Sequence, residues 1–459
     1  MLERFAPYVE SSIRKSVSNP TKLYRFLSNP IVRHYVERYQ LLKLKNSIKY
    51  CYNKSPFYHE LFEKNNLHPN DIKSFEDMNK IPFTNPEDLQ KPERFFTVPE
   101  SKFTKIFSSS GTTGKPKAAY FTKNDLEKQI SRNATGLHLV YDVEEGDRVR
   151  LTYEHGYETG DWGIRYLLEN AIQRIGAMSV ITGHRLPANK ELDLLKTYNI
   201  SILAGTTSYI YNLTCEMEPL YNLRSLHLKN IMIGSEPLPK AIRDKIEKTW
   251  NTKAYQGYGL TEIGTSIAGE CKQQNGMHIT ESDFYVEITD PVTGERLKDG
   301  QIGEVTITTL DREGMPILRY KSHDLGLIMP EPCPCGLPFR RIKIKGRTDN
   351  MVPIGSGDNL FPSECDEAIL NIPGVIDYKV VLDKKHNKDH ITVIVEIKSR
   401  TGKIQKKIET AVMKIPAIRD GVCDSKTVEK PEIKLVKQDT IDKTSSKAKR
   451  IVDNRNLYD

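Results

Sequence analysis

Five short apolar runs alternate with helical patterns in the middle of this chain, and this alternation restricts the fold more than any other feature. The runs lie at residues 148–153, 177–182, 200–204, 231–234 and 254–257. One intervening helix is predicted over residues 239–250, because Pro239 can occupy its first turn and Ile242, Ile246 and Trp250 share one face. Strand and helix in turn predict a mostly parallel, doubly wound sheet.

The length of the chain predicts more than one domain, since 459 residues exceed what one compact core usually contains. Residues 1–103 carry helical patterns, with apolar positions at Ile31, Tyr35 and Tyr39. We expect them to form a helical part of a large domain. Residues 104–346 then form the expected core of that domain.

The last third of the chain changes its pattern twice. Within the core, residues 280–345 alternate like antiparallel strands joined by turn signals. Beyond residue 346, two strand patterns at 377–382 and 390–397 and a helical one at 404–413 predict a separate unit over 347–459. The predicted class is therefore α/β: a large N-terminal domain with doubly wound, mostly parallel sheets and a small antiparallel β subdomain, then a small mobile α+β domain.

Charge and composition exclude several classes of protein. The net charge of +8 is spread over alternating lysines and acids without an arginine-rich block, so we expect no nucleic acid partner. The basic excess at 426–450 suits a polyanionic small molecule. No long apolar stretch and no secretory signal are recognisable, and the seven scattered cysteines fit a reducing compartment. We therefore expect a soluble cytoplasmic protein that does not enter a membrane.

The strongest single motif is the run Ser108-Ser109-Ser110-Gly111-Thr112-Thr113-Gly114-Lys115-Pro116-Lys117. Glycines and small hydroxyl residues let backbone amides approach a phosphate closely, and lysines add charge. Lys115 is followed by proline, where a Walker motif needs a serine or threonine for magnesium, so a P-loop NTPase is not expected. The predicted phosphate-binding residues are Ser109, Ser110, Gly111, Thr112, Thr113, Gly114 and Lys115.

With further ordered motifs, the chain resembles the adenylate-forming superfamily of acyl- and aryl-CoA synthetases, nonribosomal adenylation domains and luciferases. The matching stretches are Tyr258-Gly259-Leu260-Thr261-Glu262, residues 320–324, Gly346-Arg347-Thr348-Asp349 and Lys447. Within this superfamily it resembles most the phenylacetate-CoA ligase branch. That likeness rests on residues 207–209, 234–237, 269–271, 331–336, 361–363 and 447–455.

The resemblance implies roles for the chemistry-bearing residues. Glu262 would hold Mg²⁺, and Thr261 would contact the phosphates of ATP together with the loop at 109–115. Lys447 would bridge the carboxylate of the substrate and the α-phosphate, a step in which charge builds on phosphoryl oxygens. Asp349 would be the hinge of the C-terminal domain.

The nucleotide's base and sugar are assigned in the same way. Asp324 would accept the ribose hydroxyls, which a carboxylate can do for two donors at once, and Arg347 would contact the same region. Residues after an apolar strand are well placed to line a ligand site in a doubly wound sheet. The residues expected to line the adenine pocket are Gly234, Ser235, Glu236, Pro237, Tyr258 and Gly259.

Four residues form a candidate metal site. Cys271 and His278, with Cys333 and Cys335 about sixty residues further on, offer three thiolates and one imidazole, a set suited to tetrahedral structural Zn²⁺. The alternative is a group of unrelated buried cysteines beside a proline-rich turn.

The expected acyl pocket departs from the family pattern. The residues expected there are His155, Tyr157, Glu158 and Gly257. An acid at position 158 replaces the aromatic residue of relatives, and a buried carboxylate needs a partner or a proton. Either the substrate carries an amino or hydroxyl group that Glu158 or Asp161 meets, or both acids pair with neighbouring basic groups. His323 also stands where relatives have a small residue.

The predicted activity is that of an ATP-dependent, AMP-forming ligase that joins a carboxylic acid, first of all an aryl acid, to coenzyme A through an acyl-adenylate. The loop at 353–359 is one residue longer than in relatives, which leaves acceptors of the acyl group other than coenzyme A open. One alternative is an adenylyl-transferring synthetase of the deazaflavin-coenzyme type, or an enzyme with another acceptor. A regulator that only binds an adenylate is a third reading. The expected partners are small molecules and a second copy of the chain in a homodimer.

Overall fold

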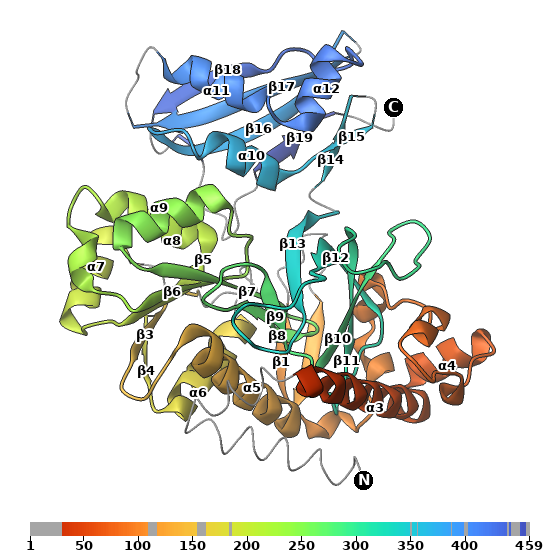
Figure 1. Cartoon of the computed structure of the whole chain (residues 1–459). Coiled ribbons are helices and arrows are strands. Elements are labelled where there is room, and N and C mark those ends of the chain that lie inside the picture. Colours follow the sequence, from red (N-terminus) through yellow and green to blue (C-terminus); the bar gives the residue numbers. More distant parts are fainter. Residues whose placement is uncertain are drawn as a thin grey trace. The chain divides into compact units, whose positions relative to one another are not determined.

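The computed structural model describes residues 30–108, 117–153, 162–182, 186–348, 351–355, 357–386, 388–398, 403–437, 440–441 and 450–455. The chain divides into two compact units, drawn with all their elements in Figure 1. The first comprises Met1–Thr206, Leu228–Ser235 and Tyr255–Ile344, and the second comprises Thr207–His227, Glu236–Ala254 and Lys345–Asp459. The domain limits predicted at residues 103 and 346 stay predictions.

Of the predicted helical region 1–103, the structure describes residues 30–103, and these form helices and short 3₁₀ turns up to residue 102. Helices α3 (Pro30–Lys54) and α4 (Pro56–Lys64) are followed by five short 3₁₀ turns at Pro69–Asp71, Glu76–Lys80, Pro86–Gln90, Pro92–Phe95 and Glu100–Lys102. The serine Ser55 caps α4, and Pro56 occupies its first turn, where no backbone donor is needed. In the described part of the chain, no helix is both long and apolar enough to cross a bilayer.

The apolar pattern of α3 does not mark its buried face throughout. Tyr35, one of the apolar positions of the pattern, is 49% exposed, whereas Leu44 and Ile48 are fully buried. Gln40 is buried too, since its amide donates to the backbone oxygens of Glu281 and Phe284. A polar residue can lie on the core face when its hydrogen bonds are satisfied there, and apolar spacing does not reveal this.

An 11-stranded sheet dominates the first unit, in the order β10-β11-β12-β13-β9-β8-β7-β6-β5-β3-β4. Its strands are β3 (Arg148–Leu151), β4 (Met178–Ile181), β5 (Ile202–Thr206), β6 (Asn230–Gly234), β7 (Lys253–Leu260), β8 (Gly264–Glu270), β9 (Met277–Ile279), β10 (Phe284–Thr289), β11 (Gly303–Thr309), β12 (Tyr320–Ile328) and β13 (Arg341–Arg347). Strands β3 to β6 pair in parallel. Antiparallel pairs join β7 to β8, β8 to β9, β9 to β13, β10 to β11 and β11 to β12. The predicted strands are confirmed, and the antiparallel strands continue the same sheet.

Helices α5 (Lys123–Tyr141), α6 (Trp162–Ile175) and α7 (Ala188–Thr197) also belong to this unit, as does a hairpin of β1 (Phe103–Ser108) and β2 (Ala118–Thr122). A capping box of Thr122 and Asp125 starts α5 directly at the end of β2. Apolar side chains of α5 and α6 pack with β1, β2 and β3 in one core cluster. The predicted phosphate loop lies between the two strands of the hairpin, outside the described residues.

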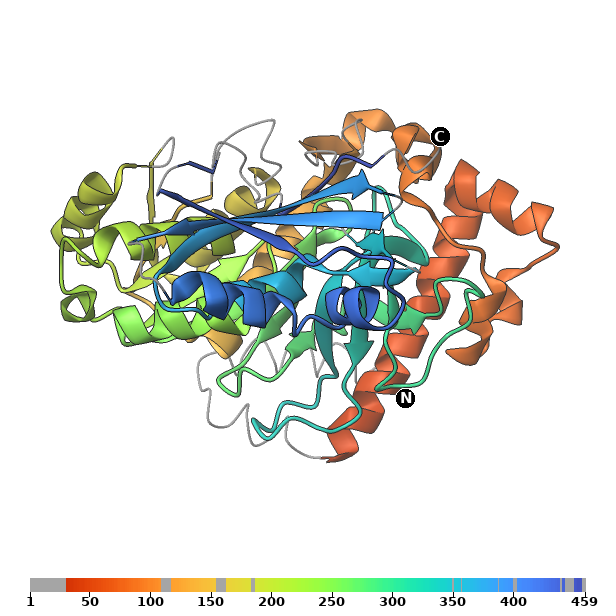
Figure 2. The same cartoon turned by 90° about the horizontal axis from the view of Figure 1, so that it is seen from above.

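The second unit contains a four-stranded sheet in the order β18-β17-β16-β19. The helices and strands of this unit are α8 (Thr207–Met217), α9 (Lys240–Trp250), β14 (Val352–Ile354), β15 (Asp358–Leu360), α10 (Pro362–Ile369), β16 (Val375–Lys385), β17 (Lys388–Ile397), α11 (Ile404–Val412), α12 (Pro416–Cys423), β18 (Glu432–Lys437) and β19 (Ile451–Asp453). Helices α11 and α12 lie on one face of this sheet (Figure 2). The helix predicted at 239–250 is α9; Ile242, Ile246 and Trp250 are buried, and Pro239 is its N-cap.

Candidate functional site

The first pair of site residues joins a carboxylate to a buried tyrosine. Glu262 lies in the turn between β7 and β8, and Tyr320 is the first residue of β12. The Tyr320 hydroxyl donates a hydrogen bond to Oε1 of Glu262 at 2.5 Å. The Lys117 ammonium lies 3.9 Å from the same oxygen. Because Lys117 is the last residue of the phosphate motif, that motif ends beside the Glu262 carboxylate.

The second pair joins the same two segments, but here β7 supplies the tyrosine and β12 supplies the acid. The Tyr258 hydroxyl, on β7, donates to Oδ2 of Asp324, on β12, at 2.6 Å. Strands β7 and β12 are not neighbours in the sheet order, so side chains connect them at this place. Each segment thus supplies one tyrosine and one acid. Carboxylate oxygens accept hydrogen bonds and bind hard cations, which suits Glu262 for a cation and Asp324 for hydroxyl groups.

The backbone of β12 is irregular at this point. His323 has a positive φ of 61°, and the pairing of β11 with β12 shifts register between Glu304 and Thr306. Bulges of this kind re-aim side chains beside functional sites. Tyr320 and Asp324 are both buried, while His323 is half-buried and lies 3.3 Å from the Glu304 carboxylate. His323, at a position where relatives have a small residue, therefore pairs with the buried acid Glu304.

Glycines allow close packing around the predicted nucleotide and acyl positions. A side chain at Gly234, the last residue of β6, would meet the Tyr153 hydroxyl at 3.0 Å. At Gly257 it would meet the Tyr141 hydroxyl at 2.9 Å. At Gly259 it would meet the backbone of β8. Only glycine fits these positions without displacing a neighbour.

Glu236 has a structural partner in its own unit. Its carboxylate accepts hydrogen bonds from the backbone amide of Ser208 at 2.7 Å and from the Ser208 hydroxyl at 3.1 Å. It therefore satisfies donors in the first turn of α8. The preceding Ser235 has a positive φ of 66°, which marks a sharp turn after β6. An adenine contact of Ser235, Glu236 and Pro237 stays a prediction.

The remaining predicted residues are placed as follows. Thr261 lies beside Glu262 in the turn after β7, and Arg347 ends β13. Several predicted residues fall outside the described part of the chain: Ser109, Ser110, Gly111, Thr112, Thr113, Gly114, Lys115, His155, Tyr157, Glu158, Asp349 and Lys447. The sequence analysis assigned no role to the Tyr320 hydroxyl or to Lys117. Alternation along β12 was the available signal, because residues 320 and 324 must share a face.

The candidate metal site is assembled from three separate segments. Cys271 follows β8, His278 lies on β9, and Cys333 and Cys335 precede β13. One ligand atom from each of the four residues lies within 4.8 Å of the others. The sulfur atoms of Cys271 and Cys333 are 3.7 Å apart, and Nε2 of His278 lies 3.3 Å from Cys335 Sγ. Three sulfurs and one nitrogen at such distances suit tetrahedral Zn²⁺.

The protonation of the cluster also fits a cation. A hydrogen bond from the Cys335 thiol, and to a smaller extent one from His278, lowers the pKa of Cys271 to about 3. Cys335 has a raised pKa for the reciprocal reason. Nδ1 of His278 lies 3.0 Å from the backbone oxygen of Phe339, and a carbonyl can only accept. The proton of neutral His278 is therefore on Nδ1, and the Nε2 lone pair faces the cysteines.

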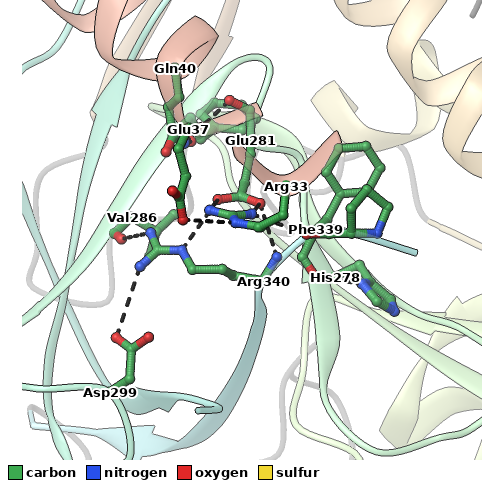
Figure 3. A network of polar contacts seen from close by, with 11 residues as sticks. Arg33, Glu37, Gln40, His278, Glu281, Val286, Asp299, Phe339 and Arg340 are labelled. Carbon is green, nitrogen blue, oxygen red and sulfur yellow. Dashed lines mark hydrogen bonds and ion pairs between the residues drawn. The ribbon is translucent and has the colours of Figure 1, made fainter. Parts of the chain in front are cut away.

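A buried carboxylate holds the segment around this cluster (Figure 3). Glu281 accepts hydrogen bonds from the guanidinium groups of Arg33, on α3, and Arg340. Arg340 also donates to the backbone oxygen of Val286 at 3.0 Å and lies 3.9 Å from Asp299. Arg33 binds Glu281 through both terminal nitrogens of its planar fork, which fixes orientation as well as distance, whereas Arg340 donates to Glu281 from Nε and from its backbone amide. The Phe339 carbonyl that orients His278 is adjacent in sequence to this network.

Comparison with known proteins decides the family. Residues 55–310 match the family described as AMP-binding enzyme, and residues 357–455 match the AMP-binding enzyme C-terminal domain. The chain belongs to the AMP-binding enzyme family. This AMP-binding enzyme is 35% identical over 371 residues to a phenylacetate-coenzyme A ligase of Pseudomonas putida, covering 79% of this chain and 82% of the relative. A phenylacetate-coenzyme A ligase of Aromatoleum evansii is 34% identical, with 91% and 94% covered.

Solved structures agree with the fold of an AMP-binding enzyme. A crystal structure of 2-hydroxyisobutyryl-CoA ligase in the postadenylation state with 2-HIB-AMP superposes with a TM-score of 0.81 at 24% identity, covering 91% of this chain and 89% of that one. A structure of the same ligase with 2-HIB-AMP and CoA gives 0.65 at 25% identity, with 92% and 90% covered. The predicted fold class and superfamily are confirmed.

Proposed function

We propose that this AMP-binding enzyme is an ATP-dependent, AMP-forming ligase that activates a carboxylic acid as an acyl-adenylate and transfers the acyl group to coenzyme A. The observation that carries the proposal is the double pairing of Tyr320 with Glu262 and of Tyr258 with Asp324. It holds two carboxylates, suited to a cation and to ribose hydroxyls, and Lys117 places the end of the phosphate motif beside the Glu262 carboxylate. The names of the relatives in Pseudomonas putida and Aromatoleum evansii support the same reaction.

The residues of this chain would act on both halves of the reaction. A substrate carboxylate oxygen bonds to the α-phosphorus of ATP, the bond to the β-phosphate oxygen breaks, and pyrophosphate leaves. Lys117 and the loop at 109–115 would bind the phosphates, and Asp324 would accept the ribose hydroxyls. The thiol of coenzyme A then replaces AMP at the carbonyl carbon and gives up its proton to solvent. Lys447 would assist the first step, with rotation at Asp349 between the two.

Magnesium has a suitable ligand in Glu262. The carboxylate has a donor on Oε1, whereas Oε2 has no hydrogen-bond partner among the residues that the structure describes. Mg²⁺ prefers one or two carboxylates together with phosphates and waters. When bound there, it would neutralise charge on the phosphates. Tyr320 would hold the carboxylate in place for that purpose.

The proposed substrate is a planar aryl acid, phenylacetate-like, in line with the names of the relatives. An amino or hydroxyl group on the acid that Glu158 or Asp161 recognises stays a prediction. If Glu158→Phe left the ranking of acids by catalytic efficiency unchanged, this part of the proposal would be wrong. A cytoplasmic location and a homodimer also stay predictions.

Pyrophosphate exchange tests the proposal against its rivals. With Mg²⁺ and ATP, the enzyme should exchange labelled pyrophosphate only when an acid from an aryl or short aliphatic panel is present. AMP should be released stoichiometrically only when coenzyme A is added. An adenylyl-transferring enzyme would keep AMP on its product, and a binding module would show no exchange with any acid. The matched relatives are CoA ligases, so they favour the first outcome.

We also propose that the four-residue cluster holds a structural Zn²⁺. It would join the β8–β9 hairpin to the loop before β13, and the closed ligand set leaves no position for a substrate. Protein purified without chelator should contain about one zinc per chain. Cys333→Ser should lower both zinc content and Tm, whereas Cys423→Ser, at an exposed cysteine far along the chain, should change neither. If the wild-type protein had the same Tm with and without zinc, the proposal would be contradicted.

A further inference from the structure

Arg312 is a buried arginine in the segment between β11 and β12, and only 7% of it is exposed. Its Nη1 donates to the backbone oxygen of Glu262 at 2.5 Å and lies 3.4 Å from that of Ile263. Its Nη2 donates to the backbone oxygen of Tyr120 at 3.2 Å. Its guanidinium lies over the Phe121 ring, 4.3 Å from the centroid.

These contacts connect two parts of the candidate ATP site. Tyr120 and Phe121 belong to β2, the strand that begins right after the phosphate motif. Glu262 carries the carboxylate proposed to hold Mg²⁺. A single planar group therefore holds the backbone of the Glu262 turn against the strand that leaves the phosphate motif. Its fork geometry allows it to bind both carbonyls at once.

The charge of Arg312 has no direct counterion. Among the described residues, no carboxylate lies within ion-pair distance, and Nε has no hydrogen-bond acceptor. The nearby charged groups are Asp125 and Glu262, but Asp125 is occupied by the backbone amides of Thr122, Glu313 and Gly314. Burial lowers the pKa of Arg312 to about 10, so the group stays charged at neutral pH.

Two other buried arginines in the same unit have carboxylate partners, whereas Arg165 and Arg341, among the described residues, donate to backbone oxygens as Arg312 does. Arg312 differs from these two by its contact with the Glu262 backbone. Arg150 donates to both carboxylate oxygens of the fully buried Glu191, at 2.6 and 2.8 Å. Arg319 pairs with Glu287 at 2.8 Å. Burying a cation without such a partner is costly. The uncompensated charge of Arg312 is free to favour an anion, and the anions expected next to it are the Glu262 carboxylate and the phosphates of ATP.

We infer that Arg312 is a positioning residue of the adenylation site, which fixes the Glu262 turn against β2 and supplies positive charge behind the Mg²⁺ and polyphosphate position. This inference rests on the proposed function for its choice of ligand. Arg312 touches no substrate in this account. It acts through the Glu262 backbone and through its field at the carboxylate.

The test compares Arg312→Met, which removes the charge and both donors, with Arg312→Lys, which keeps the charge and one donor. Acid-dependent pyrophosphate exchange is measured over a range of Mg²⁺ concentrations at saturating ATP. Arg312→Met should raise the Mg²⁺ concentration for half-maximal exchange roughly 10- to 100-fold, as removal of groups that orient a metal ligand does. Arg312→Lys should recover part of the loss.

Arg150→Met is the matched control, because it removes an equally buried arginine that touches neither Glu262 nor β2. It should lower Tm without shifting the Mg²⁺ dependence. If Arg312→Met does not fold, Arg312→Lys alone decides. A folded Arg312 variant with the wild-type Mg²⁺ dependence would overturn the inference.

Failure of the proposed function would give a different pattern. In that case the wild-type protein would exchange pyrophosphate with no acid in the panel. Binding of MgATP, measured by calorimetry, would then replace exchange as the readout for the same variants. Weaker binding by Arg312→Met than by Arg150→Met would support the positioning role, and equal binding would refute it.

Discussion

The Tyr320 hydroxyl donates to Oε1 of Glu262 at 2.5 Å, the same oxygen that lies 3.9 Å from the Lys117 ammonium. Two donors thus converge on one side of the carboxylate and leave the other oxygen for a cation. Tyr320 is buried, so its hydrogen bond is shielded from water and fixes the acid firmly. This relationship gives the site its first testable consequence.

Removing that hydroxyl should weaken catalysis without unfolding the protein. Tyr320→Phe keeps the ring, but it deletes a hydrogen bond to a charged group, worth about 1.5–3 kcal/mol. We expect catalytic efficiency in pyrophosphate exchange to fall roughly 10- to 100-fold, with a higher Mg²⁺ requirement. Tyr285→Phe is the control, since the buried Tyr285 hydroxyl has no hydrogen-bond partner among the described residues. Equal kinetics for both variants would show that the Tyr320 hydroxyl does not support catalysis through Glu262.

The Tyr258 to Asp324 bond makes a prediction about the sugar. If Asp324 accepts ribose hydroxyls, then Tyr258→Phe, which removes the hydroxyl that orients this carboxylate, should weaken its hydrogen bonds to the ribose. We expect KM for ATP to rise several-fold and the preference for ATP over 2′-deoxyATP to shrink, as hydrogen bonds to charged groups contribute about 1.5–3 kcal/mol. Steady-state exchange with both nucleotides measures this. An equal loss with ATP and 2′-deoxyATP would show that Asp324 does not read the ribose.

In the second unit, Arg450 should be a major contributor to stability. Its guanidinium forms ion pairs with Asp377 and with Asp366, the latter at 3.2 Å, and lies 4.8 Å from the centre of the Tyr378 ring. Arg450→Met would leave two buried carboxylates without their cation, which costs about 3–5 kcal/mol in comparable cases. Urea unfolding should show this loss. Arg419→Met, at an exposed arginine, should leave the unfolding curve unchanged. Similar curves for both variants would contradict the prediction.

The pH dependence of stability should reveal Asp311. Burial alone would raise the pKa of Asp311, but Lys43 and Lys128 outweigh it and leave the pKa lowered. A carboxyl group with a lowered folded pKa stabilises the protein above its unfolded pKa, and this contribution disappears as pH falls through the folded value. The difference in unfolding free energy between wild type and Asp311→Asn should stay constant from about pH 8 to 5 and shrink below about pH 4. A difference that grows as pH falls through this range would mean a raised folded pKa for Asp311 and would contradict the prediction.

The fold was largely readable from local patterns. Alternation of apolar runs with helical spacing predicted β3 to β7, because strand and helix periods differ. The burial of Gln40 was not predictable, since it depends on carbonyls of residues 281 and 284, far along the chain. Tertiary hydrogen bonds override local apolarity in such cases.

The candidate site was predicted in its residue types more than in its connections. The grouping of Cys271, His278, Cys333 and Cys335 was predicted from chemistry, because three cysteines and a histidine form a donor set suited to zinc. The crosswise tyrosine–acid pairs joined segments about sixty residues apart, and only the fold shows that they meet. Arg312 carried no motif at all. Its importance depends on burial without a counterion, a property that sequence does not record.

The central claim is that a carboxylic acid is adenylated here and then joined to a thiol. A single reaction with MgATP, phenylacetate and coenzyme A, followed by mass spectrometry, tests it most directly. The account predicts pyrophosphate and acyl-adenylate without coenzyme A, and AMP with phenylacetyl-CoA when it is added. If neither phenylacetate nor any other acid of the panel yields adenylate or thioester while the protein stays folded, the account is contradicted.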